Sequence, residues 1–316
     1  MVPELSAVVI HWRDEDHLER LVRAWPEDPR FELVVVDNGS DGSLDEILRG
    51  RATAVIRQGN LGFAGGVNAG VERACSERLL ILNPDLAPAE ETADLTDALE
   101  ALLTGFETYP DAAGLVPRLV DLAGEPQTPW QLRRLPSLGD LMLQACFFAG
   151  GAGPDREPSA GSPVEQPAAA ALALRRRAFE EVGGFDPEFF PAWFEDVDFA
   201  QRLQAAGHVL VYHPAATFRH ALGATVSSLG YGSFLWIYYR NLMRYTTKHF
   251  GEAAAAFLRI VLPVTALLRC IALPLRRPRR AVSRWQAAEG LRTLALGVVS
   301  RWRRPESLRR RYGVRS

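Results

Sequence analysis

The stretch "RLLILNPDL" (Arg78–Leu86) is the part of the sequence from which the fold can best be read. It begins as a short, continuously apolar run, which is typical of a strand buried on both faces of a sheet. It then stops on Asn83, Pro84 and Asp85. All three residues favour turns for backbone reasons, so an ordinary loop is the simplest interpretation. The neighbouring segments decide whether this turn also carries a function.

Apolar strands and helices alternate on both sides of this stretch. The pattern predicts strands at residues 5–12, 31–37, 53–58, 78–83, 114–121 and 168–176, with short strands at 208–214 and 217–220. It predicts helices at residues 14–25, 43–50, 66–77, 88–106, 178–183 and 194–207. Because the strands are apolar throughout rather than alternating, they indicate a mostly parallel α/β sheet that helices cover on both faces.

The composition changes twice along the chain. Residues 150–167 are rich in Gly, Pro and Ser, which predicts a loop. Beyond Gly230 the sequence turns to long helical stretches of Leu, Ala and Arg. We therefore predict an α/β domain over residues 1–229 and a helical, Arg-rich extension over residues 230–316.

The net charge of −2 conceals a strong segregation of charge. Residues 230–316 contain 18 basic and three acidic side chains, a net charge of +15, so residues 1–229 carry −17. A basic end on an acidic body indicates that this end faces something anionic, either a phospholipid surface or nucleic acid.

Cysteine usage and the N-terminal sequence bear on the compartment. Cys75, Cys146 and Cys270 are widely spaced and form no motif. This pattern favours a reducing compartment over a disulfide framework or a zinc cluster. The first residues lack a basic segment followed by a long apolar stretch, so we expect no secretory signal.

Three successive predicted strands end in polar residues: Asp37-Asn38, residues 57–60, and Asn83-Pro84-Asp85. Because the carboxyl ends of parallel strands meet at one edge, where open sheets bind ligands, we expect these side chains to lie close together. The loop NLGFAGGVNAG (60–70) opens a helix and would offer backbone N–H groups to a diphosphate. It matches neither the P-loop nor the usual dinucleotide fingerprint. Loop-forming residues without a ligand remain the alternative.

Four segments in order are VVVDNGSDGS (34–43), NLGFAGGVNAG (60–70), LILNPDL (80–86) and FFPAWFEDVDFAQRLQAAG (189–207). Together they resemble the family 2 glycosyltransferases, with the closest likeness to the bacterial rhamnosyltransferase-like branch. The resemblance covers about residues 5–225. It implies a GT-A fold, a nucleotide-sugar donor and inversion at the anomeric carbon.

The resemblance places Asn83-Pro84-Asp85 where the family has its metal-binding Asp-x-Asp. Pro84 fixes φ and stops the strand from continuing as a helix. The carboxylate of Asp85 and the donor phosphates suit a hard divalent cation, Mg²⁺ or Mn²⁺. Asn83 binds a cation more weakly than aspartate, but can form a hydrogen bond with a ribose hydroxyl. His220 matches the histidine that often completes the metal site, although a single His after a strand is commonly structural.

The resemblance also implies a set of residues that bind the donor: Asp37, Asn38, Arg57, Asn60, Gly62, Asn83 and Asp85. Asp37 would contact the nucleoside, and it can cap the following turn at the same time. Residues 60 and 62 would lie near the diphosphate or the ribose. Residues 126–167 show no readable motif, and we expect contacts with the acceptor there.

Glu195, Asp196 and Asp198 stand at the start of a predicted helix. Acids are favoured in a first helical turn, and Asp198 can pair with Arg202, so a structural role is one interpretation. The preceding aromatic segment would partly bury these acids, and burial raises a carboxylate's pKa toward the range of a general base. The family's Glu-Asp motif lies here and deprotonates the acceptor hydroxyl. We assign the base to Asp196, with Glu195 as the alternative and Asp198 in support.

Residues 253–275 form an apolar stretch long enough to span a membrane, but Arg259 and Arg269 interrupt it. On a helical wheel the apolar side chains gather opposite the two arginines. This geometry favours a helix in the membrane interface, with a bend at Pro263. A helical subdomain packed on the core is the alternative, and nucleic-acid binding is less favoured because no recognised binding fold accompanies the charge.

The sequence thus predicts a metal-dependent, inverting glycosyltransferase in the cytoplasm, peripheral on the inner face of the plasma membrane. Its favoured donor is dTDP-L-rhamnose, with UDP-hexoses, UDP-galactofuranose and GDP-mannose left open. The acceptor would be a cell-envelope or polyprenyl-diphosphate-linked saccharide. The alternatives are a sugar-nucleotide pyrophosphorylase and a non-catalytic, membrane-attached protein that binds nucleotide sugars.

Overall fold

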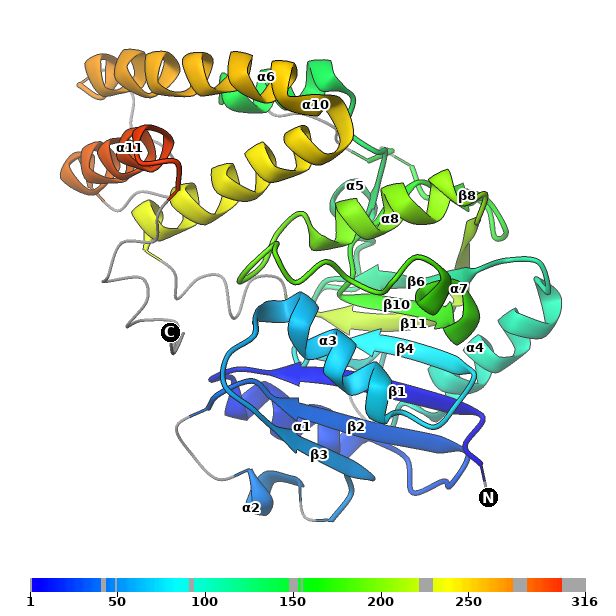
Figure 1. Cartoon of the computed structure of the whole chain (residues 1–316). Helices are drawn as coiled ribbons and strands as arrows, with labels where there is room; N and C mark the ends of the chain where they lie inside the picture. Colours follow the sequence, from blue (N-terminus) through cyan, green and yellow to red (C-terminus); the bar gives the residue numbers. More distant parts are fainter. Residues whose placement is uncertain are drawn as a thin grey trace. The chain divides into compact units, whose positions relative to one another are not determined.

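The computed structural model of the chain divides into two compact units (Figure 1). The structure describes residues 2–40, 44–48, 50–90, 94–147, 153–154, 156–221, 230–274 and 283–302. Unit 1 comprises Met1–Leu135, Ala152–Pro187 and Glu195–Thr225, and unit 2 comprises Pro136–Gly151, Glu188–Phe194 and Val226–Ser316. The predicted domain boundary at residues 229 and 230 lies at the edge of a stretch outside the described residues, and it stays a prediction.

A mixed sheet forms the centre of unit 1. Within the described residues its strands run in the order β3-β2-β1-β4-β10-β6-β11-β5, and β8 pairs with β11. The strands are β1 (Leu5–His11), β2 (Phe31–Asp37), β3 (Ala54–Arg57), β4 (Arg78–Leu82), β5 (Leu86–Pro88), β6 (Gly114–Val120), β8 (Pro163–Val164), β10 (Ala171–Arg175) and β11 (Leu210–His220). The first four strands are parallel, as is the pair β6–β11, whereas β10, β5 and β8 are antiparallel to their neighbours. The predicted mostly parallel sheet is confirmed.

Helices cover both faces of this sheet, as Figure 1 shows. They are α1 (Glu15–Ala24), α2 (Asp45–Leu48), α3 (Gly62–Arg73), α4 (Thr96–Thr108), α5 (Thr128–Gln131), α7 (Arg176–Glu181) and α8 (Glu195–Ala205). A second, two-stranded sheet joins β7 (Leu132–Arg133) to β9 (Gln166–Pro167).

Strand β2 shows why the strands are apolar throughout. Leu33 and Val35 belong to the core on the face that α1 and α4 cover. Val34 and Val36 point the other way, into the core built with α3 and α8. Because successive side chains in a strand point to opposite faces, a sheet buried on both sides needs an apolar residue at every position.

Several element boundaries differ from the prediction. Helix α3 begins at Gly62, so most of the glycine-rich segment is helix rather than loop. The helix predicted at residues 88–106 begins only at Thr96, because residues 86–88 form a strand beside β11. The two short strands predicted at 208–214 and 217–220 are one strand, β11, with an irregularity between His213 and Thr217. The loop predicted at 150–167 contains β8 and β9.

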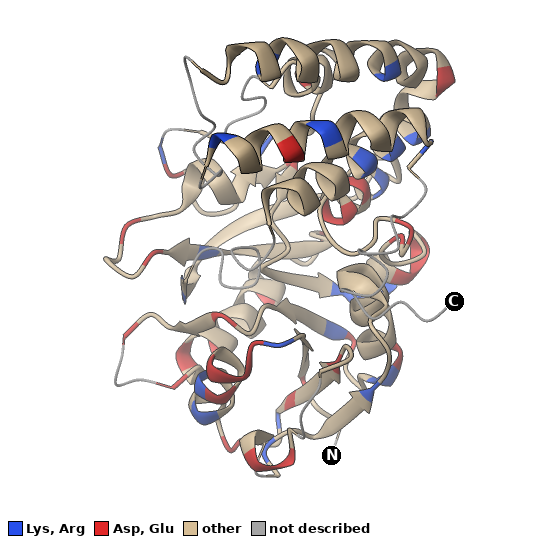
Figure 2. Ribbon diagram, turned by 90° about the vertical axis from the view of Figure 1, so that its left-hand side faces the viewer, with Lys and Arg blue, Asp and Glu red and all other residues tan. Residues whose placement is uncertain are grey.

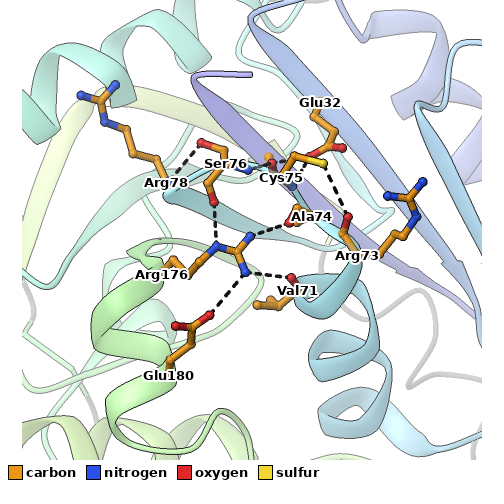
Figure 3. A network of polar contacts seen from close by, with 10 residues as sticks. Glu32, Val71, Arg73, Ala74, Cys75, Ser76, Arg78, Arg176 and Glu180 are labelled. Atoms are coloured by element: carbon orange, nitrogen blue, oxygen red, sulfur yellow. Dashed lines mark hydrogen bonds and ion pairs between the residues drawn. The ribbon is translucent and has the colours of Figure 1, made fainter. Parts of the chain in front are cut away.

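A polar network secures the end of α3 and the start of β4 (Figure 3). The guanidinium of Arg176 donates to the carbonyls of Val71, Ala74 and Ser76 at 2.7–3.0 Å. These carbonyls lie at the C-terminal end of α3, where a cation is favoured by the helix dipole. A carboxylate oxygen of Glu32 accepts from the backbone N–H of Cys75 at 2.8 Å. The network fixes one end of α3, and thereby the direction of its other end, at Gly62.

Unit 2 is helical. It contains α6 (Leu138–Ala145), α10 (Tyr231–Ala272) and α11 (Arg284–Val299). We expected a bend at Pro263, but the backbone of α10 leaves helical geometry at Gly251, which has a φ of 86°. Only glycine adopts this conformation readily, so Gly251 divides α10 into two helical halves. In the ribbon of Figure 2 the charged positions on these helices are mostly Lys and Arg.

Candidate active site

The Asn-Pro-Asp corner brings together two residues that are far apart in sequence. After β4 ends, the chain turns at Pro84 and continues as β5, which pairs antiparallel with β11 in the register Leu86 to His220. This pairing sets Oδ2 of Asp85 3.5 Å from Nε2 of His220. Both side chains are buried, and Oδ1 of Asp85 has no hydrogen-bond partner among the described residues.

Gln127 fixes the orientation of His220. Its Nε2 donates to the backbone carbonyl of His220 at 3.0 Å, so its Oε1 faces the imidazole, 2.8 Å from Nδ1. An amide oxygen can only accept, so Nδ1 donates its hydrogen to Gln127, and Nε2 is the ring nitrogen that faces Asp85. The ring of Trp130 lies against the imidazole with 5.0 Å between centroids.

This arrangement fits a divalent cation. Within the described part of the chain no group of three or more His, Cys, Asp and Glu residues could hold a metal ion, so Asp85 and His220 form a pair. Oδ1 of Asp85, which is buried without a partner, and Nε2 of His220 in its neutral form supply two ligand positions. Mg²⁺ and Mn²⁺ in sugar-nucleotide chemistry take remaining ligands from water and substrate phosphates, so two protein ligands are compatible with such an ion.

Asn38 organises the edge of the sheet between β2 and α3. Its Nδ2 donates to the carbonyl of Gly62 at 3.0 Å and to Oδ1 of Asn60 at 3.3 Å. Its Oδ1 accepts from the backbone of Leu61 and from the side chain of Gln58. Both ends of the Asn38 amide therefore form hydrogen bonds within the protein, and these bonds position the start of α3.

The other predicted donor-binding residues divide into two groups. Asp37 is buried at the end of β2 and accepts from the backbone N–H of Ser40 at 2.9 Å, the turn-capping role anticipated for it. Oδ1 of Asn60 accepts from the N–H of Gly62 at 2.8 Å. Arg57, in contrast, is exposed and pairs with Asp45 of α2.

Asn83 retains an uncommitted side chain beside this edge. Its backbone N–H donates to the carbonyl of Ala170 at 2.8 Å, whereas its side chain makes no hydrogen bond within the described residues. The amide is thus available to a ligand hydroxyl.

The acid pair opens helix α8. Glu195 is buried, and its Oε2 has no hydrogen-bond partner in the described part of the chain. Burial raises the pKa of Glu195 well above its ordinary value, and the neighbouring charge of Asp196 raises it further. Burial also raises the pKa of Asp196, but the charge of Arg133 and the backbone N–H groups of Val197 and Ala169 oppose this rise. Of the two, Asp196 is better held as an anion.

Arg133 and Gln166 face the same oxygen of Asp196. Nη2 of Arg133 lies 3.6 Å from Oδ2, and Nε2 of Gln166 donates to it at 3.4 Å. The two residues are opposite one another in the small β7–β9 sheet. Both contacts are long, so the second sheet places a positive charge beside Asp196 without tying up its carboxylate.

Two short segments connect the acid pair to the Asn-Pro-Asp corner. The backbone N–H of Ala169 lowers the pKa of Asp196, and the next residue, Ala170, accepts from the N–H of Asn83. Neighbouring Cα atoms are about 3.8 Å apart, so both groups meet the same stretch of backbone. In addition, the segment 127–133 contacts His220 at its first residue and Asp196 at its last. Asp85 and Asp196 therefore belong to one region of unit 1.

Asp198 forms the pair with Arg202 that the structural interpretation of the sequence predicts, and its support of the base stays a prediction. Its carboxylate is fully buried and accepts from Nε of Arg202 at 2.8 Å. Arg202 also donates to the carbonyls of Val182 and Gly184, which anchors α8 to the preceding turn.

The sequence did not identify four residues of the site: Gln127, Trp130, Arg133 and Gln166. All lie in the segment 126–167, which shows no motif. The polar residues in "PQTPWQLRR" (126–134) are the one available signal, because they interrupt a segment that is partly buried.

Comparisons with known proteins identify the family of the chain. The model of the family "Glycosyl transferase family 2" matches residues 6–183. The chain is 28% identical over 246 residues to the N-acetylglucosaminyl-diphospho-decaprenol L-rhamnosyltransferase of Mycobacterium tuberculosis, which covers 70% of this chain and 76% of that protein.

Solved structures with a similar fold include two glycosyltransferases. The mannosyltransferase PcManGT from Pyrobaculum calidifontis, in complex with GDP-Man and Mn²⁺, has a TM-score of 0.53 at 15% identity and covers 95% of this chain and 88% of its own. GalNAc-T7 with UDP, GalNAc and Mn²⁺ has a TM-score of 0.54 at 14% identity and covers 98% of this chain and 58% of its own. At such identities the likeness concerns the fold, and the predicted GT-A fold is confirmed. The family match extends over more than half of the chain, and the chain therefore belongs to glycosyl transferase family 2 and is a glycosyltransferase.

Proposed function

We propose that this enzyme transfers L-rhamnose from dTDP-L-rhamnose, with inversion, to a saccharide linked to a polyprenyl diphosphate. The name of the mycobacterial relative, an L-rhamnosyltransferase that acts on N-acetylglucosaminyl-diphospho-decaprenol, supports both the sugar and the acceptor class. UDP-hexoses, UDP-galactofuranose and GDP-mannose are the competing donors, and the mannosyltransferase neighbour keeps GDP-mannose among them.

One observation carries the proposal. The acid pair at the start of α8 and the Asn-Pro-Asp corner after β4 meet neighbouring residues of one backbone segment, Asp196 at Ala169 and Asn83 at Ala170. A transferase needs a proton acceptor on one side of the sugar and a group that handles the leaving diphosphate on the other. The short connection between Asp196 and Asn83 supports both tasks in one site.

The reaction is a single displacement. Asp196 accepts the proton of the acceptor hydroxyl while that oxygen attacks the anomeric carbon. The bond between this carbon and the diphosphate oxygen breaks, and the nucleoside diphosphate leaves with the electron pair. Because attack and departure occur on opposite faces, the configuration inverts. Arg133 and Gln166 lie beside Oδ2 of Asp196, and the positive charge of Arg133 opposes the rise in the pKa of Asp196 that burial causes.

Asp85 and His220 would hold the divalent cation, Mg²⁺ or Mn²⁺. When bound, such an ion stabilises the negative charge that develops on the leaving diphosphate. Gln127 holds His220 by Nδ1, which would leave Nε2 for the ion.

The remaining contacts with the donor would come from residues at the carboxyl ends of the strands. We assign Asp37 and Asn83 to hydroxyl groups of the nucleoside, and Asn60 and the start of α3 at Gly62 to the diphosphate. Asn38 supports this edge from within. Arg57 would have to leave Asp45 in order to reach the donor.

The proposal also concerns the location of the enzyme in the cell. A polyprenyl-linked acceptor lies in a membrane, so we propose a peripheral location on the cytoplasmic face of the plasma membrane and contact with anionic lipid there. Family membership favours this function over a sugar-nucleotide pyrophosphorylase or a non-catalytic binding protein.

The test measures the thermal stability of the purified chain with each candidate nucleotide sugar, with and without Mn²⁺. We expect dTDP-L-rhamnose with Mn²⁺ to raise the unfolding temperature most, because binding to the folded state stabilises it. Selective stabilisation by another donor would replace rhamnose in the proposal. Equal effects with and without Mn²⁺ for every donor would contradict the role of the cation.

A further inference from the structure

The second half of α10, from residue 252 to residue 272, has two contrasting faces. One face is formed by Ala255, Leu258, Leu262 and Ala266, each at most 1% exposed. The other carries apolar side chains that are 50–68% exposed: Phe257, Ile260, Val264, Leu267, Leu268 and Ile271. At about 100° per residue these six side chains fall within an arc of about 100°, opposite the buried face. We call them the apolar stripe.

The buried face is fixed to protein. Oγ1 of Thr265 donates to the carbonyl of Ala145, at the end of α6, at 2.8 Å. Farther along, Nη2 of Arg269 donates to the carbonyl of Phe147 at 2.8 Å, and the guanidinium lies 4.3 Å from the centre of the Phe147 ring. These contacts and the buried side chains show that one side of the helix packs against protein.

The helix is nevertheless apolar enough for lipid. Among the described residues, α10 is the one helix whose length and mean hydropathy, 1.9 in its most apolar window, would allow it to cross a membrane. A helix that crosses a bilayer as an isolated anchor meets lipid on all sides. Because protein covers one side of α10, only the apolar stripe remains for another partner.

We propose that the apolar stripe docks on an anionic phospholipid bilayer, with the second half of α10 lying in the plane of the interface rather than across the membrane. The charge of the sequence that contains the stripe favours this partner. No acidic residue occurs between residues 253 and 272, and residues 230–316 carry a net charge of +15. An amphipathic helix with apolar side chains on one face and basic surroundings binds headgroups and acyl chains together.

The stripe has the extent that such docking requires. From Phe257 to Ile271 it runs about 21 Å along the helix axis. Continuous exposed apolar patches of this kind on soluble proteins mark interaction sites. Because docking is measured as binding, it succeeds or fails independently of the transfer reaction proposed above.

The first experiment measures partition of the full chain onto vesicles of phosphatidylcholine with or without phosphatidylglycerol. We expect binding to the anionic vesicles that added salt weakens. The variant Ile260→Gln/Leu267→Gln/Ile271→Gln should reduce this binding on the order of 100-fold, because three apolar side chains lose their burial. The control Leu122→Gln/Val209→Gln changes exposed apolar residues of unit 1 and should bind as the parent does. Undiminished binding of the triple variant, with folding confirmed by circular dichroism, would overturn the proposal.

The second experiment distinguishes a helix in the plane from a spanning helix. An environment-sensitive fluorophore is attached at Ile260→Cys or Ile271→Cys in a background without Cys75, Cys146 and Cys270, whose folding is checked first. Quenching by lipids labelled at known depths then gives the position of each site. Equal, shallow depths support the proposal. A difference near the roughly 16 Å that separates the sites along the axis would mean that the helix spans. Self-association of the chain without quenching by lipid would assign the stripe to a second copy instead.

Discussion

Replacing Gln127 by leucine tests how the histidine of the proposed cation site is held. The substitution removes two hydrogen bonds, the one that Nε2 donates to the carbonyl of His220 and the one that Oε1 accepts from Nδ1. It leaves the size of the side chain almost unchanged. Nδ1 of His220 then has no acceptor to fix its proton, so the ring can rotate or exchange tautomers.

The expected magnitudes follow from these two contacts. A buried hydrogen bond contributes about 1 kcal/mol net, and a polar group left without a partner costs about 1–3 kcal/mol, so unfolding free energy should fall by about 2–4 kcal/mol. Partners of metal-ligating histidines typically contribute 10–100-fold to metal affinity. Mn²⁺ affinity, measured by electron paramagnetic resonance in the presence of nucleoside diphosphate, should therefore fall by about 10–100-fold.

Gln131→Leu is the matched control. Gln131 lies one helical turn after Gln127, at the end of α5, and its side chain bonds the backbone of Pro117 and Leu119 rather than His220. Its loss should destabilise the protein to a similar degree in urea unfolding while Mn²⁺ affinity remains unchanged. If both variants lost equal stability and neither lost Mn²⁺ affinity, Gln127 would be purely structural and the reasoning refuted.

Three further predictions concern the carboxylates. Asp196→Asn keeps an oxygen for the N–H of Val197 but cannot accept a proton. The value of kcat should therefore fall by about 10²–10⁴-fold, while donor affinity measured by calorimetry stays the same. Parallel loss of kcat and donor affinity would make the residue structural. Asp85→Ala should abolish the Mn²⁺-dependent part of donor binding, and its persistence would locate the cation elsewhere. The folded protein raises the pKa of Glu195, so the contribution of this carboxyl to stability is present at low pH. It is lost as the pH rises above about 4.3, the ordinary pKa of glutamate in an unfolded chain. Glu195→Gln should therefore unfold at a higher temperature than the parent, by a margin that grows from pH 4 to pH 8, and a constant margin would contradict the burial of this carboxyl.

The sequence predicted those features that depend on local pattern. The strands could be read because Leu33–Val36 and their counterparts must be apolar on both faces of a covered sheet. The Asn-Pro-Asp corner and the acid pair could be read because strand ends and first helical turns are marked by residue type. The start of α3 could not be read, because Gly62 and the glycines after it favour a loop locally. The hydrogen bond that Asn38 donates to Gly62 and the one that Asn60 accepts from it outweigh that tendency.

The residues that contact His220 and Asp196 could not be predicted from local sequence pattern. Gln127 contacts His220 across 93 positions of sequence, and Arg133 contacts Asp196 across 63. Such pairings arise from the sheet topology, in which β5 lies beside β11 and β7 lies beside β9. The two interpretations of the C-terminal helix were posed as alternatives, interfacial or packed. The two faces of α10 show that it packs on one side and is exposed on the other.

The most direct test asks whether the carboxylates of Asp85 and Asp196 serve one bound sugar. It is a crystal structure with Mn²⁺ and a non-transferable analogue of dTDP-L-rhamnose, in which anomalous scattering locates the ion. We predict an anomalous peak next to Oδ1 of Asp85 and Nε2 of His220, with the open face of the anomeric carbon turned toward Asp196. A peak bound by other residues, or a sugar whose open face points away from Asp196, would contradict the account.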